Sequence, residues 1–173
     1  EARDRLARAK VSPKQVQAAW IKLANKGPTG SLQDHGRKLE RDTLAVLRNA
    51  RAQFPNIRIA YLGSRTYGGY AIGGLNPEPY AYESAFAVRW LIQDQSKASA
   101  KLNYDAARGD VNAPLLLWGP YLWADGLKPR QSDGFVWKQE DFAGDGTHPS
   151  ATGRQKVAEQ LLKFFKGDAN ART

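Results

Sequence analysis

Three short apolar segments, separated by stretches with helical periodicity, constrain the fold of this chain most strongly. The segments are residues 16–24 (VQAAWIKLA), 57–63 (IRIAYLG) and 114–119 (PLLLWG). Apolar segments of this length that alternate with helices are typical of parallel strands covered by helices on both faces. The pattern therefore predicts an α/β fold with three αβα layers around a parallel sheet.

Helices between these strands are predicted from the spacing of apolar residues and from residues that start or stop a helix. Apolar positions recur every three or four residues after Ser31, and Pro55 ends that helix. Ser150 is a favourable N-cap for the last helix. The predicted helices span residues 2–10, 31–54, 82–95 and 150 onward, and the last is expected to bury Val157, Leu161, Leu162 and Phe165.

Two loops that follow the predicted strands are rich in aromatic residues. Ligands of parallel α/β sheets bind at the carboxyl ends of the strands, where aromatic rings can stack on a sugar or an aryl group. The loop after residue 63 is too rich in Gly and Pro for regular structure, and a small hairpin is expected at residues 132–134. The candidate substrate-binding rings are Tyr67, Tyr70, Trp118 and Tyr121, with Tyr80, Tyr82 and Trp123 beside them; packing within the loops is the alternative.

Residues 144–155 (GDGTHPSATGRQ) contain Asp145 and His148, and His148 is one of two histidines in the chain. A histidine can take a proton from a hydroxyl group and return it to a leaving group when a carboxylate holds its other ring nitrogen. The three-residue separation on a glycine-containing turn lets the two side chains converge. The segment thus predicts an acid–base pair, with a plain helix entry as the alternative.

Composition narrows the range of functions. The chain has 173 residues, of which 42% are hydrophobic, and we expect one folded domain over residues 1–173. Its net charge of +9 arises from basic residues mixed with acidic ones, which favours a solvated basic surface over a nucleic-acid interface. No apolar run is long enough for a membrane span. Cysteine is absent, which is compatible with a reducing or an oxidising compartment.

The stretch DGTHPSATGRQKVAEQLL resembles the last conserved block of the SGNH, or GDSL-type, hydrolases, in which Asp-x-x-His-Pro opens the C-terminal helix and supplies two members of a triad. The resemblance spans residues 10–166 and implies a flavodoxin-like sheet in which the three apolar segments are the third, fourth and fifth strands. It implies that His148 is the general base and that Asp145 orients it.

The resemblance also assigns a role to Asn25, which follows the first apolar segment. The family has an Asn there that donates a hydrogen bond to the oxyanion, usually within Gly-x-Asn-Asp. Leu23 and Lys26 stand where this pattern has Gly and Asp. A turn residue that ends the strand is the alternative role of Asn25.

The family blocks that carry the nucleophile are not found in this chain. In the family, the serine of Gly-Asp-Ser follows the first strand, and a glycine after the second strand completes the oxyanion hole. Since the chain also lacks methionine and starts at Glu1, we expect it to be the C-terminal part of such a domain, with the serine on a second polypeptide segment. Residues 16–24 would then have an unpaired edge that binds this segment or self-associates. Ser64, after the second strand, is the alternative nucleophile.

The resemblance implies an esterase or acyl hydrolase, and the aromatic loops favour carbohydrate or other small esters as its substrates. No cofactor is expected, and a secreted or periplasmic location is favoured. A non-catalytic carbohydrate-binding domain with the same fold is the alternative. A metal site is disfavoured because its candidate ligands lack a recognised spacing. Those ligands are Asp133, Glu140, Asp141, Asp145 and His148. Arg65 and Glu83 are expected to pair across the loop between them, and His35 has no assigned role.

Overall fold

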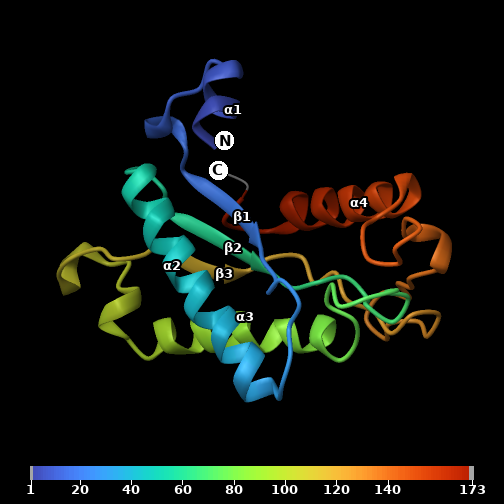
Figure 1. Cartoon of the computed structure of the whole chain (residues 1–173). Coiled ribbons are helices and arrows are strands. Elements are labelled where there is room, and N and C mark those ends of the chain that lie inside the picture. The colour runs from blue at the N-terminus through green and yellow to red at the C-terminus, as the bar shows by residue number, and fades with distance from the viewer. Residues whose placement is uncertain (1, 172–173) are drawn as a thin grey trace.

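A computed structural model, which describes residues 2–171, has three parallel strands between helices (Figure 1). The strands lie in the order β1 (Ala18–Lys22), β2 (Ile59–Gly63) and β3 (Leu115–Trp118). The pairing of β1 with β2 runs from Ala18–Ile59 to Lys22–Gly63, and that of β2 with β3 from Ile59–Leu115 to Leu62–Trp118, so neighbouring strands run in the same direction. The predicted α/β class with a parallel sheet is therefore confirmed.

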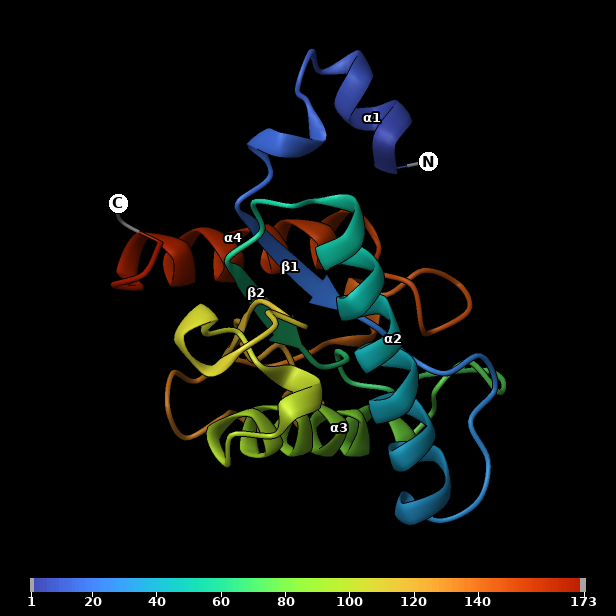
Figure 2. The same cartoon turned by 90° about the vertical axis from the view of Figure 1, so that its left-hand side faces the viewer.

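Helices lie on both faces of this sheet (Figure 2). Side chains alternate along β2, so Leu62 joins Leu47 and Leu91 in one apolar core, whereas Tyr61 faces the other way and contacts Phe164 and Phe165. The helices α2 (Arg37–Gln53) and α3 (Tyr80–Ser96) thus cover one face, and α4 (Ala151–Gly167) crosses the other. The remaining α-helix among the described residues is α1 (Ala2–Arg8).

The helix ends agree with most of the predicted boundaries. Ser150 caps α4, because its side chain accepts the backbone N–H of Gly153. The predicted helix from residue 31 begins instead with a π-helical turn, Leu32–Gly36, which leads directly into α2. The expected burial of Leu162 is wrong, because this side chain is 59% exposed, and Val157, Leu161 and Phe165 are half-buried. The helix meets the sheet through its two phenylalanines.

The first helix, α1, projects from the body of the molecule and buries none of its residues (Figure 1). It ends two residues earlier than predicted, and Lys10 beyond it adopts a left-handed backbone conformation with φ 57°. Within residues 2–171, no helix is both long enough and apolar enough to cross a membrane.

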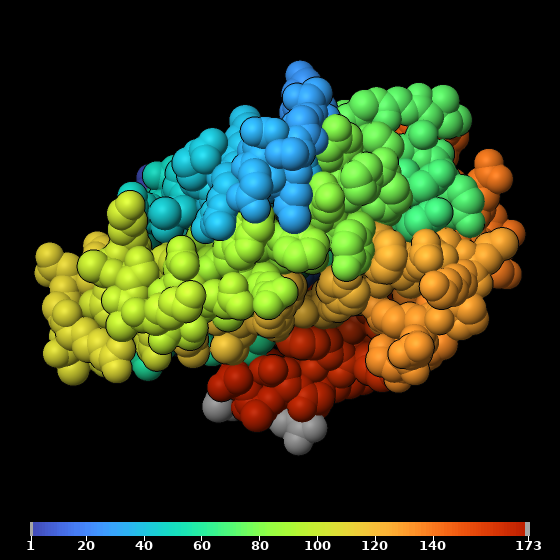
Figure 3. Space-filling model, turned by 90° about the horizontal axis from the view of Figure 1, so that it is seen from below, coloured from blue at the N-terminus to red at the C-terminus, as the bar shows by residue number. Residues whose placement is uncertain are grey.

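A second apolar cluster is built by the loops at the carboxyl edge of the sheet. Trp137 and Phe142 are buried there, and Tyr67 and Tyr70 pack against them. Figure 3 shows the segment after β2 (green) beside the segment after β3 (orange) at one end of the molecule. The hairpin predicted at residues 132–134 is a turn with no strand on either side. These long loops are therefore ordered by aromatic packing.

Candidate active site

Asp145 and His148 meet through the two atoms that a catalytic acid–base pair requires. Oδ2 of Asp145 lies 2.5 Å from Nδ1 of His148. Oδ1 of Asp145 accepts the backbone N–H groups of Thr147 and His148, each at 2.9 Å. The bond from the His148 side chain, followed by these backbone bonds, holds the pKa of Asp145 well below its usual range. Asp145 is therefore ionised near neutral pH and holds the imidazole ring.

The backbone of the loop after β2 clamps the turn that carries this pair. Gly146 has a φ of 64°, and a Cβ added to it would lie 1.7 Å from the carbonyl oxygen of Tyr70. The backbone N–H of Ile72 donates to the carbonyl of Asp145 at 3.0 Å. Glycine is required at position 146 because both the conformation and the close approach exclude a side chain.

The ring of His148 is accessible from solvent. Its side chain is 68% exposed, and that of Asp145 is 44% exposed. Nε2 of His148 forms no hydrogen bond with any residue in the described part of the chain. With Nδ1 held by Asp145, Nε2 is the nitrogen that is free to exchange a proton with an incoming hydroxyl group. The same segment also serves as the entry to α4, so the two interpretations of the sequence are compatible.

Asn25 lies at the same edge of the sheet but makes other contacts. Its side-chain N–H donates to the carbonyl of His35 at 2.7 Å, and its side-chain oxygen is buried without a partner among residues 2–171. The side chain of Asn76 donates to the Asn25 carbonyl at 2.7 Å, which ties Asn25 to the loop that contacts Asp145. An oxyanion role for Asn25 stays a prediction. Since one N–H of its side-chain amide is donated to His35, this role requires the other N–H.

The structure divides the four candidate substrate-binding rings into two pairs. Tyr67 and Tyr70 are half-buried, with ring centroids 5.1 Å apart, and the hydroxyl of Tyr70 donates to the Trp137 carbonyl. Both rings therefore belong to the second apolar cluster, as in the alternative interpretation. Trp118 and Tyr121 are 39% and 37% exposed, and the guanidinium carbon of Arg130 lies over the Tyr121 ring, 5.9 Å from its centroid.

Two further expectations concern residues that flank the loop after β2. Ser64 is only 2% exposed, so its hydroxyl cannot reach a substrate without movement of the loop.

The expected pairing of Arg65 with Glu83 is wrong. Glu83 instead contacts Nε2 of His35 at 2.6 Å, because the first turn of α3 packs beside the π-helical turn that carries His35.

Sequence reasoning missed Glu78, which organises the same loop. Its Oε1 accepts the backbone N–H of Gly68 and the indole N–H of Trp123, and its Oε2 accepts the backbone N–H of Tyr82. A glutamate just before the first turn of a helix is the local signal for such a role. The contact with Trp123 is tertiary and has no signal in the sequence.

The acidic residues considered as metal ligands are dispersed into separate pairs. Among residues 2–171, no group of three or more histidines and acidic residues is placed to hold a metal ion. Each of the paired carboxylates has a basic partner. The pairs are Asp133 with Arg130, Asp141 with Lys156, Asp145 with His148, and Glu140 with Lys138.

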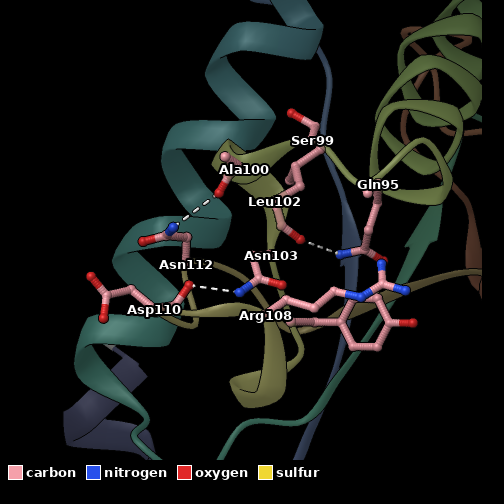
Figure 4. Close-up of a pocket in the computed structure, with 10 residues that line it drawn as sticks. Gln95, Ser99, Ala100, Leu102, Asn103, Arg108, Asp110 and Asn112 are labelled. Atoms are coloured by element: carbon pink, nitrogen blue, oxygen red, sulfur yellow. Dashed lines mark hydrogen bonds between the residues drawn. The ribbon is translucent and has the colours of Figure 1, made fainter.

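A cavity of about 320 Å³ opens at the opposite, amino end of the sheet (Figure 4). Its polar side chains bind the surrounding backbone. Asn112 donates to the Ala100 carbonyl and Gln95 to the Leu102 carbonyl, both at 2.9 Å. These two amides therefore serve to hold the surrounding backbone.

No family model, no curated protein and no solved structure matches this chain. Its function is therefore inferred from its own residues.

Proposed function

We propose that the chain is the C-terminal part of an SGNH-type serine ester hydrolase that acts on carbohydrate or other small esters. The observation that carries the proposal is the 2.5 Å contact between Oδ2 of Asp145 and Nδ1 of His148. Asp145 and His148 precede α4, the last helix, as the Asp-x-x-His-Pro block of the SGNH hydrolases precedes the C-terminal helix of that family. Ligands bind at this edge of parallel α/β sheets.

In this mechanism a serine hydroxyl attacks the ester carbonyl while Nε2 of His148 accepts its proton. Asp145 stays ionised and stabilises the imidazolium ion that forms. N–H donors, among them the amide of Asn25, stabilise the oxyanion of the tetrahedral intermediate. His148 then protonates the departing alcohol, and a water molecule hydrolyses the acyl-enzyme through the same steps.

The nucleophilic serine comes from a segment outside this chain, which we call the front segment. Three observations support this part of the proposal. Ser64 is buried, and no hydroxyl group within residues 2–171 binds Nε2 of His148. The outer edge of β1 has no partner strand in the described part of the chain. In the family, the strand that leads to the serine lies beside this edge, so its loop would end near the carboxyl edge of the sheet.

A groove of about 800 Å³ opens over β1 and β2 beside the end of α4. Ala18, Trp20, Tyr61 and Phe165 are among the residues that line it, so an apolar surface lies close to the unpaired edge of β1. A strand added to that edge would satisfy its unpaired backbone groups.

The exposed rings of Trp118 and Tyr121 favour a sugar-containing or aryl ester as substrate. The alternative of a non-catalytic carbohydrate-binding domain is weakened, because Tyr67 and Tyr70 pack into the loop cluster instead of forming a binding surface.

Hydrolysis of 4-nitrophenyl acetate tests the proposal. The chain alone should act no faster than its His148→Ala variant. After it is joined to the polypeptide encoded upstream of Glu1, hydrolysis should appear, and His148→Ala should lower kcat by about 10⁴-fold or more. Turnover by residues 1–173 alone that Ser64→Ala abolishes would show that the serine lies within the chain.

A further inference from the structure

Two basic side chains start from neighbouring strand ends at the carboxyl edge of the sheet. Lys22 is the last residue of β1 and pairs with Gly63 of β2, and Arg65 follows Gly63 by two residues. Both side chains are half-buried. Neither forms a hydrogen bond or an ion pair through its side chain with any residue in the range 2–171, and Nε of Arg65 is fully buried.

Such a pair of cations without a counterion is unfavourable. Burial removes water from each charge, and the charges repel each other. Burial, followed by the charge of Arg65, lowers the pKa of Lys22 to about 8. Burial also lowers the pKa of Arg65. A bound anion would relieve both effects.

The other half-buried basic side chains among the described residues have partners. Nζ of Lys156 lies 2.5 Å from Asp141, and the guanidinium of Arg130 lies 2.5 Å from Asp133. Arg51 has no acidic partner and its Nε is buried without an acceptor, but its Nη1 donates to the carbonyl of Pro55. Lys22 and Arg65 differ from these residues because their side chains form no hydrogen bond or ion pair within residues 2–171.

One acidic residue, Glu78, acts on this pair without neutralising it. Glu78 is close enough to raise the pKa of Arg65, although less than burial lowers it. Both of its oxygens are already occupied by N–H donors, from Gly68 and Trp123 on one oxygen and Tyr82 on the other. Glu78 is thus fixed in the loop, and the pair keeps an excess of positive charge.

A third donor without an acceptor lies beside Lys22. Nε1 of Trp20 is buried and has no hydrogen-bond partner among the described residues. A Cβ added to Gly63 would lie 3.0 Å from this nitrogen and 3.8 Å from Cβ of Lys22. Trp20 and Lys22 share one face of β1, so both side chains leave the strand on the same side of the sheet, next to Gly63.

We propose that Lys22 and Arg65 form a subsite for an anionic group of the substrate, so that the preferred substrate is an acidic ester such as an ester of a sugar acid. The planar guanidinium of Arg65 matches the geometry of a carboxylate, and Lys22 adds a compact charge. The inference rests on the proposed function, because the loop that begins at Ser64 also contacts Asp145 at the same edge. The other source of such a group is an acidic side chain of the front segment.

Binding to residues 1–173 is measured first, with glucuronate as the probe and glucose as its neutral counterpart, at constant ionic strength. Glucuronate should raise the Tm and shift the amide resonances of residues 20–22 and 63–66, and glucose should not. Lys22→Gln and Arg65→Gln should each weaken the binding at least tenfold. Lys97→Gln also removes one positive charge, but from an exposed lysine after α3, and it should bind glucuronate as the wild type does. Equal effects of glucuronate and glucose would overturn the proposal.

Without the probe, Lys22→Gln should be as stable as the wild type or more stable, because one of two repelling charges is removed. This variant therefore separates a loss of binding from a loss of folding. Unchanged glucuronate binding by a folded Lys22→Gln variant would also overturn the proposal.

The chain joined to its front segment distinguishes the two sources of the anionic group. If the substrate supplies the anionic group, kcat/KM should be higher for a carboxylated aryl ester than for the neutral ester. Arg65→Gln should lower the preference, which is kcat/KM for the carboxylated ester divided by kcat/KM for the neutral ester, at least tenfold. If hydrolysis occurs with no preference, the front segment fills the subsite and the substrate proposal is wrong. If no ester is hydrolysed while residues 1–173 still bind glucuronate, the hydrolase proposal fails and the anion site stands.

Discussion

Asp145 is the residue whose hydrogen bonds define the candidate site. Its two oxygens accept three bonds, one from the ring of His148 and two from backbone N–H groups. All three favour the ionised carboxylate, and its folded-state pKa lies below the ordinary value of 3.8. The contribution of Asp145 to stability is therefore present above about pH 4 and is lost as the pH falls through the depressed pKa.

NMR titration of the carboxyl carbon should find a pKa of Asp145 below 3.8. In His148→Ala this pKa should rise, because the largest cause of the depression is removed, yet it should stay below 3.8 because the backbone bonds persist. The difference in unfolding free energy between wild type and Asp145→Asn should shrink below about pH 4. An unchanged pKa in His148→Ala would show that the two side chains do not interact in solution.

The sequence predicted the contact between Asp145 and His148 because both lie on one short turn. It did not predict contacts that depend on the packing of distant segments. The binding of Glu83 to His35 is of this kind. For Tyr67 the sequence left substrate binding and inward packing as alternatives, and tertiary packing decides between them. Lys22 had a local signal, a basic residue within an apolar strand, but its proximity to Arg65 follows from strand pairing.

The element that positions the candidate site is α4, whose first turn packs against the loop before it. A Cβ added to Gly153 would lie 1.9 Å from the carbonyl oxygen of Asp141. Helix propensity alone favours alanine over glycine by about 1 kcal/mol. The close contact should dominate, because a backbone oxygen cannot move aside as a flexible side chain can.

Gly153→Ala should therefore lower the free energy of unfolding by about 1–3 kcal/mol, as measured by urea denaturation. Gly167→Ala is the matched control, since nothing lies within 4 Å of an added Cβ at that end of α4. The control should be neutral or slightly more stable. Equal stabilisation by both substitutions would mean that α4 does not approach Asp141 as closely as described.

The strands and helices could be predicted because apolar periodicity and capping residues lie within the sequence of each element. The three apolar segments coincide with β1, β2 and β3, and Ser150 caps α4. The π-helical turn Leu32–Gly36 was not predicted, because its apolar spacing differs little from that of the α-helix that follows. The exposure of Leu162 was also missed, since the periodicity of a helix cannot show how much of its apolar face has a partner.

For the whole molecule, the outer edge of β1 decides how the chain associates. Within residues 2–171 this edge has no partner strand, and the groove beside it is apolar. Unpaired N–H and C=O groups on a strand edge bind other strands readily. The chain should therefore bind its front segment or associate with itself along residues 16–24.

Light scattering on the purified chain should give a mass above 19.1 kDa, and adding the front segment should convert the assembly to a one-to-one complex. Amide exchange along residues 16–24 should become slower in that complex, because the edge acquires hydrogen bonds. A stable monomer with slow exchange along residues 16–24 and no second chain present would contradict an open edge.

Covalent labelling with an aryl phosphonate, which reacts with activated serines, tests most directly whether His148 activates a serine from outside this chain. After the chain is joined to its front segment, mass spectrometry should find the phosphonyl group on a serine that precedes Glu1. His148→Ala should slow the labelling at least 100-fold, because general-base assistance is lost. Labelling of Ser64 or of any other serine within residues 1–173, or labelling that is equally fast in His148→Ala, would contradict this mechanism.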